Sequence, residues 1–224
     1  MEDSRRAAVR MKILVAISSC SKYEANHQSM RDTWLKEAVT LGMDYLFFVE
    51  RSPEPHRPGR KIHSDTVVTN GDEWAMTDRL KFKIKYAYDH GYDFVFCCFP
   101  DTYVRPERLL LSGFEKFDYF GTVYCHPNGT PYCQGGAGYM LSRKAMEAAF
   151  TDPSDYLNDD CWLGDVLGKT ALARGHSEDF HQWWGSPEKS NTSVTCHLSH
   201  TSNSLGVVYD ASFMYREHQH WLES

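Results

Sequence analysis

Short apolar runs of strand length alternate along this chain with segments that have the apolar spacing of a helix. Because parallel strands need helical crossovers between them, this order is typical of a mainly parallel sheet covered by helices. The sequence therefore predicts the α/β class. The expected strands cover residues 12–17, 45–49, 93–98 and 117–124, and the expected helices include residues 24–40, 74–90, 143–150 and 161–173.

The composition is that of one globular protein of 224 residues, 42% of them hydrophobic and 24% charged. We expect a single domain over 1–224, with 1–11 as a flexible N-terminal segment. The net charge of −6 argues against nucleic-acid binding, and no apolar run approaches the ~20 residues of a membrane span. Seven cysteines, an odd number, favour a reducing compartment. A soluble cytoplasmic protein is expected, with a truncated Golgi or ER lumenal domain as the alternative.

A glycine-rich segment, residues 133–142, leads from turn-permitting residues into a strand-like run and then a helix, for which Ser142 is the expected N-cap. Gly135, Gly136 and Gly138 fall within four positions. Glycine admits positive φ and lets the backbone approach a ligand closely, so this loop suits the wall of a ligand site. A tight turn or β-bulge with no ligand is the alternative.

Two acidic positions are candidates for chemistry. Asp101 follows an expected strand, where a divalent cation such as Mn²⁺ or Mg²⁺ would bridge it to a diphosphate. Asp160, beside Asp159 at the start of an expected helix, could take a proton from an alcohol. Ordinary structural roles compete with both assignments: Asp101 could stabilise a turn after Pro100, and Asp159 or Asp160 could cap the helix.

Among eleven histidines, His197 is the first candidate to complete a metal site, because residues 193–198 alternate like a strand that returns to the sheet. His181 is the runner-up. Either histidine could instead be a hydrogen-bonded packing residue. Trp183 and Trp184 are either core residues or a surface on which an acceptor sugar stacks.

These motifs resemble the inverting β1,3-glycosyltransferases of the core-1 galactosyltransferase and fringe group, and the resemblance runs through nearly the whole chain. The glycine loop at 135–142 and the acidic motif at 159–161 match closely. Residues 13–17 with 30–34 look like the first strand and the arginine-x-threonine-tryptophan helix of that family. Residues 180–181, 186–188, 194–197 and 210–215 look like the carboxyl-terminal part of its core-1 branch.

The resemblance implies the GT-A fold, a UDP-sugar donor, Mn²⁺, a glycan or glycoconjugate acceptor, and transfer with inversion. Galactose is the sugar expected from the branch. Asp160 becomes the catalytic base, with Asp159 beside it, and Asp101 and His197 become the metal ligands. The residues expected to bind the nucleotide sugar are Ser18, Ser19, Arg31, Lys81, Phe99, Pro100, Gly135, Gly136 and Ala137.

One departure from the family pattern stands at residues 99–101. Family members carry three acidic residues before the Thr-Tyr-Val stretch, whereas this chain has Phe99, Pro100 and Asp101. Fewer charged oxygens should hold a hard cation more weakly. Two alternatives therefore stay open: a transferase-like binding or chaperone module without catalysis, and a metal-independent transferase that uses Arg31 or Lys81 as its charge clamp.

Overall fold

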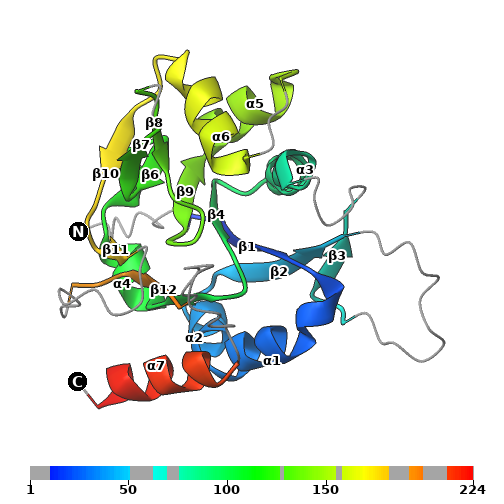
Figure 1. Cartoon of the computed structure of the whole chain (residues 1–224), viewed down its shortest axis with the longest axis vertical. Coiled ribbons are helices and arrows are strands. Elements are labelled where there is room, and N and C mark those ends of the chain that lie inside the picture. Colours follow the sequence, from blue (N-terminus) through cyan, green and yellow to red (C-terminus); the bar gives the residue numbers. More distant parts are fainter. Residues whose placement is uncertain are drawn as a thin grey trace, which may run out of the picture.

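A computed structural model describes residues 11–50, 63–69, 76–126, 129–154, 158–181, 192–198 and 211–223. Its centre is a seven-stranded sheet with the strand order β10-β6-β9-β4-β1-β2-β3 (Figure 1). β9 is antiparallel to both of its neighbours, and the other pairings are parallel. The predicted α/β class with a mainly parallel sheet is confirmed. The strands are β1 Ile13–Ser19, β2 Asp44–Val49, β3 Thr66–Val68, β4 Phe94–Cys98, β6 Tyr119–Gly121, β9 Tyr139–Ser142 and β10 Arg174–His176.

Helices cover both faces of this sheet, with α1, α2 and α7 on one face and α3, α5 and α6 on the other (Figure 1). Side chains alternate along β1, so Val15 and Ile17 pack in one core and Leu14 and Ala16 in the other. Burial on both faces explains why β1 is a continuous apolar run. The helices are α1 Glu24–Asp32, α2 Trp34–Thr40, α3 Met76–Asp89, α4 Pro106–Leu111, α5 Arg143–Thr151, α6 Asp159–Gly168 and α7 Ser212–Leu222.

Two small sheets flank the main one. In the three-stranded sheet β11-β12-β5, β12 runs antiparallel to β5 and places His197 opposite Thr102. This pairing returns a segment near the end of the chain to the strand that follows β4. The remaining elements are β5 Thr102–Val104, β7 Val123–Cys125, β8 Pro131–Cys133, β11 Phe180–His181, β12 Thr195–His197 and the 3₁₀ helices η1 Ser21–Tyr23 and η2 Phe114–Lys116.

Local geometry confirms the expected N-cap Ser142 and explains two further helix boundaries. The Ser142 side chain accepts a hydrogen bond from the backbone N–H of Ala145 and caps α5. Gly91 follows α3 with φ +72°, a backbone conformation that glycine adopts without strain. Pro106 stands in the first turn of α4, where a missing N–H removes no helical bond.

Other boundaries differ from the prediction. The helix expected over 24–40 breaks at Thr33, whose hydroxyl donates to the carbonyl of Ser29. The strand expected over 117–124 divides into β6 and β7, which belong to different sheets. The helix expected over 161–173 begins at Asp159 and ends at Gly168, and its N-cap is Asn158 and not Asp159.

In the described ranges, the helices are too short or too polar to cross a bilayer.

Candidate functional site

The candidate site forms where the carboxyl ends of β1 and β4 lie side by side. Ile17 of β1 pairs with Cys98 of β4, so the ends of both strands open at the same edge of the sheet. Open α/β sheets bind ligands at this edge. Three further segments reach it from distant parts of the chain: the glycine loop, the start of α6 and the end of β12.

The glycine loop is a tight turn held by the small sheet. The N–H of Gly138 donates to the carbonyl of Gly135 (3.0 Å), and Gly138 has φ +80°. Two threonines fix the turn from outside: Thr102 donates its hydroxyl to the carbonyl of Gly136 (2.9 Å), and Thr195 donates to that of Ala137 (2.6 Å). Both hydroxyls are buried, so the loop is a rigid wall.

Asp160, in the first turn of α6, faces this wall. Its Oδ2 accepts a hydrogen bond from the N–H of Gly135 (2.8 Å), while its buried Oδ1 has no hydrogen-bond partner among the described residues. Burial, and secondly the neighbouring carboxylate of Asp159, hold the pKa of Asp160 well above its usual range; the Gly135 N–H and the charge of Lys83 oppose them. A carboxylate with a raised pKa is a stronger base.

Asp159 is buried as well, and burial raises its pKa, against the opposing charges of Lys83 and Arg79. Its Oδ1 accepts from the N–H of Asp160 (3.1 Å). The N-cap Asn158 fixes the start of α6 through a bond from the N–H of Cys161 (3.1 Å). The positive end of the helix dipole favours the two carboxylates at this position.

Asp101 and His197 form a pair on the other side of the glycine loop. The Nε2 of His197 lies 3.2 Å from Oδ2 of Asp101, and the buried Oδ1 of Asp101 has no hydrogen-bond partner among the described residues. A Cβ atom on Gly136 would lie 2.6 Å from Nδ1 of His197, so the imidazole rests against the loop. The structure thus brings both predicted metal ligands together.

An oxygen and a nitrogen donor at this spacing fit a divalent cation that takes its other ligands from a diphosphate. Within the described ranges, no three His, Cys, Asp or Glu side chains gather as a metal-binding group. A cation between Asp101 and His197 would therefore need further ligands from outside the described side chains.

The residues expected to bind the nucleotide sugar lie in five segments: the end of β1, α1, α3, the residues after β4 and the glycine loop. Ser18 and Ser19 end β1, where Ser18 accepts from Lys83 (2.6 Å) and Ser19 lies 2.6 Å from Nε2 of His27. Arg31 forms a bidentate pair with Asp65 (2.8 and 3.0 Å) and also bonds Glu24. These carboxylates already neutralise its guanidinium.

Lys81 is not among the residues that the structure gathers at the strand ends. Its ammonium donates to the carbonyl of Ser154 and lies 5.0 Å from the centre of the Trp162 ring. Phe99 does face the site, because a Cβ atom on Gly135 would lie 2.7 Å from its ring. Pro100, partly buried, joins Phe99 to Asp101.

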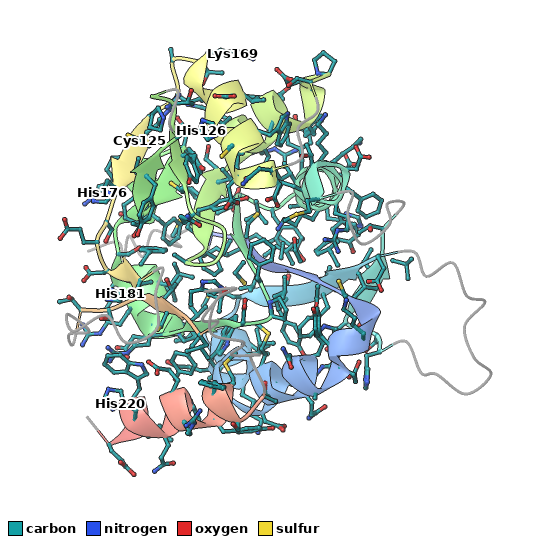
Figure 2. The ribbon with its side chains drawn as sticks, in the orientation of Figure 1. Cys125, His126, Lys169, His176, His181 and His220 are labelled. Atoms are coloured by element: carbon teal, nitrogen blue, oxygen red, sulfur yellow. The ribbon has the colours of Figure 1, made fainter. Side chains whose placement is uncertain are left out.

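The other predicted residues are further away or outside the described ranges. His181 lies on β11, paired in register with Cys196, and its Nε2 is 2.8 Å from the hydroxyl of Ser193 (Figure 2). That bond gives it a packing role in the small sheet. Trp183 and Trp184, the expected acceptor surface, lie outside the residues that the structure describes.

Sequence reasoning missed Arg79 and Lys83, two buried basic residues on α3. Arg79 donates to the carbonyl of Ser19 (3.0 Å), and Lys83 to the hydroxyl of Ser18. The two positions are four residues apart and therefore share one face of the helix, next to the apolar residues Leu80 and Ile84. This spacing was a signal in the sequence, since a pair of basic residues on a core-facing stripe needs an explanation.

No family model matches the chain. Human chondroitin sulfate glucuronyltransferase is 27% identical over 177 residues, which cover 68% of this chain but only 22% of that protein. Among solved structures, a glycosyltransferase involved in glycosylation of the major capsid of PBCV-1 aligns over 92% of this chain and 99% of its own, with 11% identity and a TM-score of 0.53. The glycosyltransferase GlyE of Streptococcus pneumoniae TIGR4 aligns over 96% and 64%, with 11% identity and a TM-score of 0.49. The chain thus shares the α/β fold of the glycosyltransferase involved in glycosylation of the PBCV-1 capsid.

Proposed function

We propose that this protein is a glycosyltransferase that moves a sugar from a nucleotide-sugar donor to a hydroxyl of a glycan or glycoconjugate. One observation carries the proposal: a single glycine turn is in contact with the carboxyl group of Asp160 at Gly135 and with the imidazole of His197 at Gly136. The turn thereby brings a candidate base for the acceptor and two candidate metal ligands to one strand edge. The name of the human relative, a glucuronyltransferase, agrees with this class of reaction.

Asp160 acts as the general base in the proposed reaction. Its unpaired Oδ1 takes the proton of the acceptor hydroxyl while the hydroxyl oxygen attacks the anomeric carbon of the donor. The bond from that carbon to the diphosphate oxygen breaks, and the nucleoside diphosphate leaves. A single displacement of this kind inverts the anomeric configuration. Asp159 supports the reaction by raising the pKa of Asp160.

Asp101 and His197 would hold a divalent cation, Mn²⁺ or Mg²⁺, through the unpartnered Oδ1 and through Nε2. When bound, the ion would neutralise charge on the departing diphosphate. The Phe99 ring lies against Gly135, where the resembled family carries a carboxylate, so the donor would meet an apolar surface there.

UDP-galactose is the donor we propose first, on the resemblance to the core-1 group. UDP-glucuronate is the second, because of the name of the human relative. The two differ at C4, where the hydroxyl is axial in galactose and equatorial in glucuronate, and at C6, where galactose has a hydroxymethyl group and glucuronate a carboxylate. One assay with both donors separates them.

The experiment compares the wild type with Asp160→Asn and with Asp165→Asn, a control on the same helix. UDP binding is followed by calorimetry with Mn²⁺ and with chelator, and transfer is followed as UDP release in the presence of acceptor glycans. We expect Asp160→Asn to bind UDP like the wild type and to lose transfer by about 10²- to 10⁴-fold, with Asp165→Asn unchanged. UDP binding without transfer for any donor would favour the non-catalytic binding module, and transfer that survives in Asp160→Asn would overturn the base assignment.

A further inference from the structure

Lys83 is a buried lysine at the carboxyl end of β1. Only 2% of it is exposed, and its ammonium donates to the hydroxyl of Ser18 (2.6 Å), which is itself 5% exposed. Burial of a charged group is unfavourable unless partners compensate it. The burial of the Lys83 ammonium therefore needs a physical reason.

Among the described residues, the hydrogen bonds and ion pairs of Lys83 do not supply that reason. An ammonium has three N–H donors, and among the described residues the bond to Ser18 is the one that Lys83 makes. No described carboxylate forms an ion pair with it. Arg31 is different, since Asp65 and Glu24 both pair with its guanidinium.

The charge of Lys83 also reaches the other side of the site. It opposes the rise that burial causes in the pKa values of Asp159 and Asp160, at the start of α6, and of Cys98, at the end of β4. The ammonium, bonded to Ser18 at the end of β1, thus acts electrostatically on groups at the end of β4 and in the first turn of α6.

We propose that Lys83 is a diphosphate-binding residue, whose two remaining N–H donors bond phosphate oxygens of the donor substrate at the end of β1. The identity of the ligand rests on the proposed function. Lys83 transfers no proton in this step: its N–H donors stabilise the negative charge that develops on the β-phosphate oxygen as the bond to the sugar breaks. Ser18 orients the ammonium before the donor arrives.

The test is calorimetry with three probes: UDP, inorganic pyrophosphate and uridine, each in excess chelator and again with Mn²⁺. The variants are Lys83→Met, Lys83→Arg and Lys85→Met, the last an exposed lysine on the same helix that pairs with Asp89. We expect Lys83→Met to bind UDP and pyrophosphate at least tenfold more weakly in both conditions and uridine as the wild type does. Lys83→Arg should keep most of the affinity, and Lys85→Met all of it.

The outcomes separate this inference from the proposed function. If the wild type binds UDP and a folded Lys83→Met binds it equally well, the inference fails and the transferase proposal stands. If pyrophosphate binding depends on Lys83 but no nucleotide binds, the anion site stands without the proposed function. Should Lys83→Met not fold, ¹⁵N spectra of the lysine side chains decide: the Lys83 resonance, identified by its absence in Lys83→Arg, shifts on addition of pyrophosphate, and an unchanged resonance overturns the inference.

Discussion

The backbone of Gly135 is in direct contact with the carboxyl group of Asp160. The N–H of Gly135 donates to Oδ2 of Asp160 (2.8 Å), and a Cβ atom at Gly135 would lie 2.5 Å from Oδ1 of the same carboxyl group. A residue with a side chain therefore cannot occupy position 135 unless the carboxyl group moves. Glycine at this position is needed for close approach, and the backbone hydrogen bond then fixes the carboxyl group.

Gly135→Ala should lower transfer by at least tenfold, because the new methyl group displaces Asp160 and the Phe99 ring. Overpacking of this kind also lowers the free energy of unfolding by about 1–3 kcal/mol. Steady-state kinetics and urea unfolding measure the two effects. Gly168→Ala is the control, since its Cβ would meet only the end of the Arg174 side chain at 3.3 Å. Wild-type turnover in a folded Gly135→Ala would contradict the assignment of the site.

Asp159→Asn should shift the pH dependence of kcat/KM to lower pH. Burial and then the Asp159 carboxylate raise the pKa of Asp160, and the base must be ionised to act, so activity rises as pH rises through that pKa. Removal of the negative charge of Asp159 lowers the pKa of Asp160, so the rising limb of the kcat/KM profile moves to lower pH. The pH midpoint of this rising limb depends on all the titratable groups near Asp160, which also include Lys83, Tyr119, Tyr139 and Cys133.

The measurement is a pH series of kcat/KM for the wild type, Asp159→Asn and Asp165→Asn. The Asp165 variant should keep the wild-type midpoint, because Asp165 is not among the groups that shift the pKa of Asp160. An unchanged or upward midpoint in Asp159→Asn would refute electrostatic coupling between the two carboxyl groups.

The elements that carry this site could be predicted because their signals are local. β1 is a continuous apolar run, the glycine loop is a cluster of one residue type, and the cap Ser142 directly precedes α5. The break at Thr33 has no glycine or proline to mark it. It depends on a hydroxyl that competes for a helical carbonyl, which sequence patterns indicate only weakly.

The charged residues of the site were harder to predict, because their role depends on the rotation of α3. Lys81 and Lys83 stand two positions apart and point to different sides of the helix, toward Ser154 and Ser18 respectively. The four-residue spacing of Arg79 and Lys83 beside the apolar stripe of α3 was the signal for a buried basic face. The pairing of His197 with Asp101 was predicted, and the register of β12 on β5 explains it.

Asn158→Ala should affect catalysis more than the loss of an N-cap side chain at another helix does. Asn158 caps α6, and the next two residues are the acidic pair, so loss of the cap loosens the segment that positions Asp160. We expect a loss of about 1 kcal/mol in unfolding free energy and a kcat several-fold lower, with an unchanged KM for the donor. Ser142→Ala removes the cap of α5 and should leave kcat within twofold. Equal kinetic effects in the two variants would show that the cap of α6 has no special role.

His27→Gln should remove part of the acid sensitivity of the fold. His27 is 1% exposed, bonds Ser19 and stacks on Phe47 at 4.3 Å, and burial lowers its pKa from 6.5 to about 4, against the opposing charge of Glu24. Because the folded pKa lies below the unfolded one, the unfolded state binds the proton more readily between these values. The free energy of unfolding therefore falls as pH drops from about 6.5 to about 4, by up to about 3 kcal/mol.

The pKa values of Asp159 and Asp160 are raised, so where these groups titrate the free energy of unfolding falls as pH rises, opposite to the effect of His27. The informative quantity is therefore the difference in slope between the variant and the wild type. Urea unfolding at several pH values across this window measures it. His220→Gln, which alters a histidine on the outer surface of α7, is the control and should keep the wild-type slope (Figure 2). A His27→Gln protein with the full wild-type slope would show that burial of the neutral imidazole does not cause the acid sensitivity.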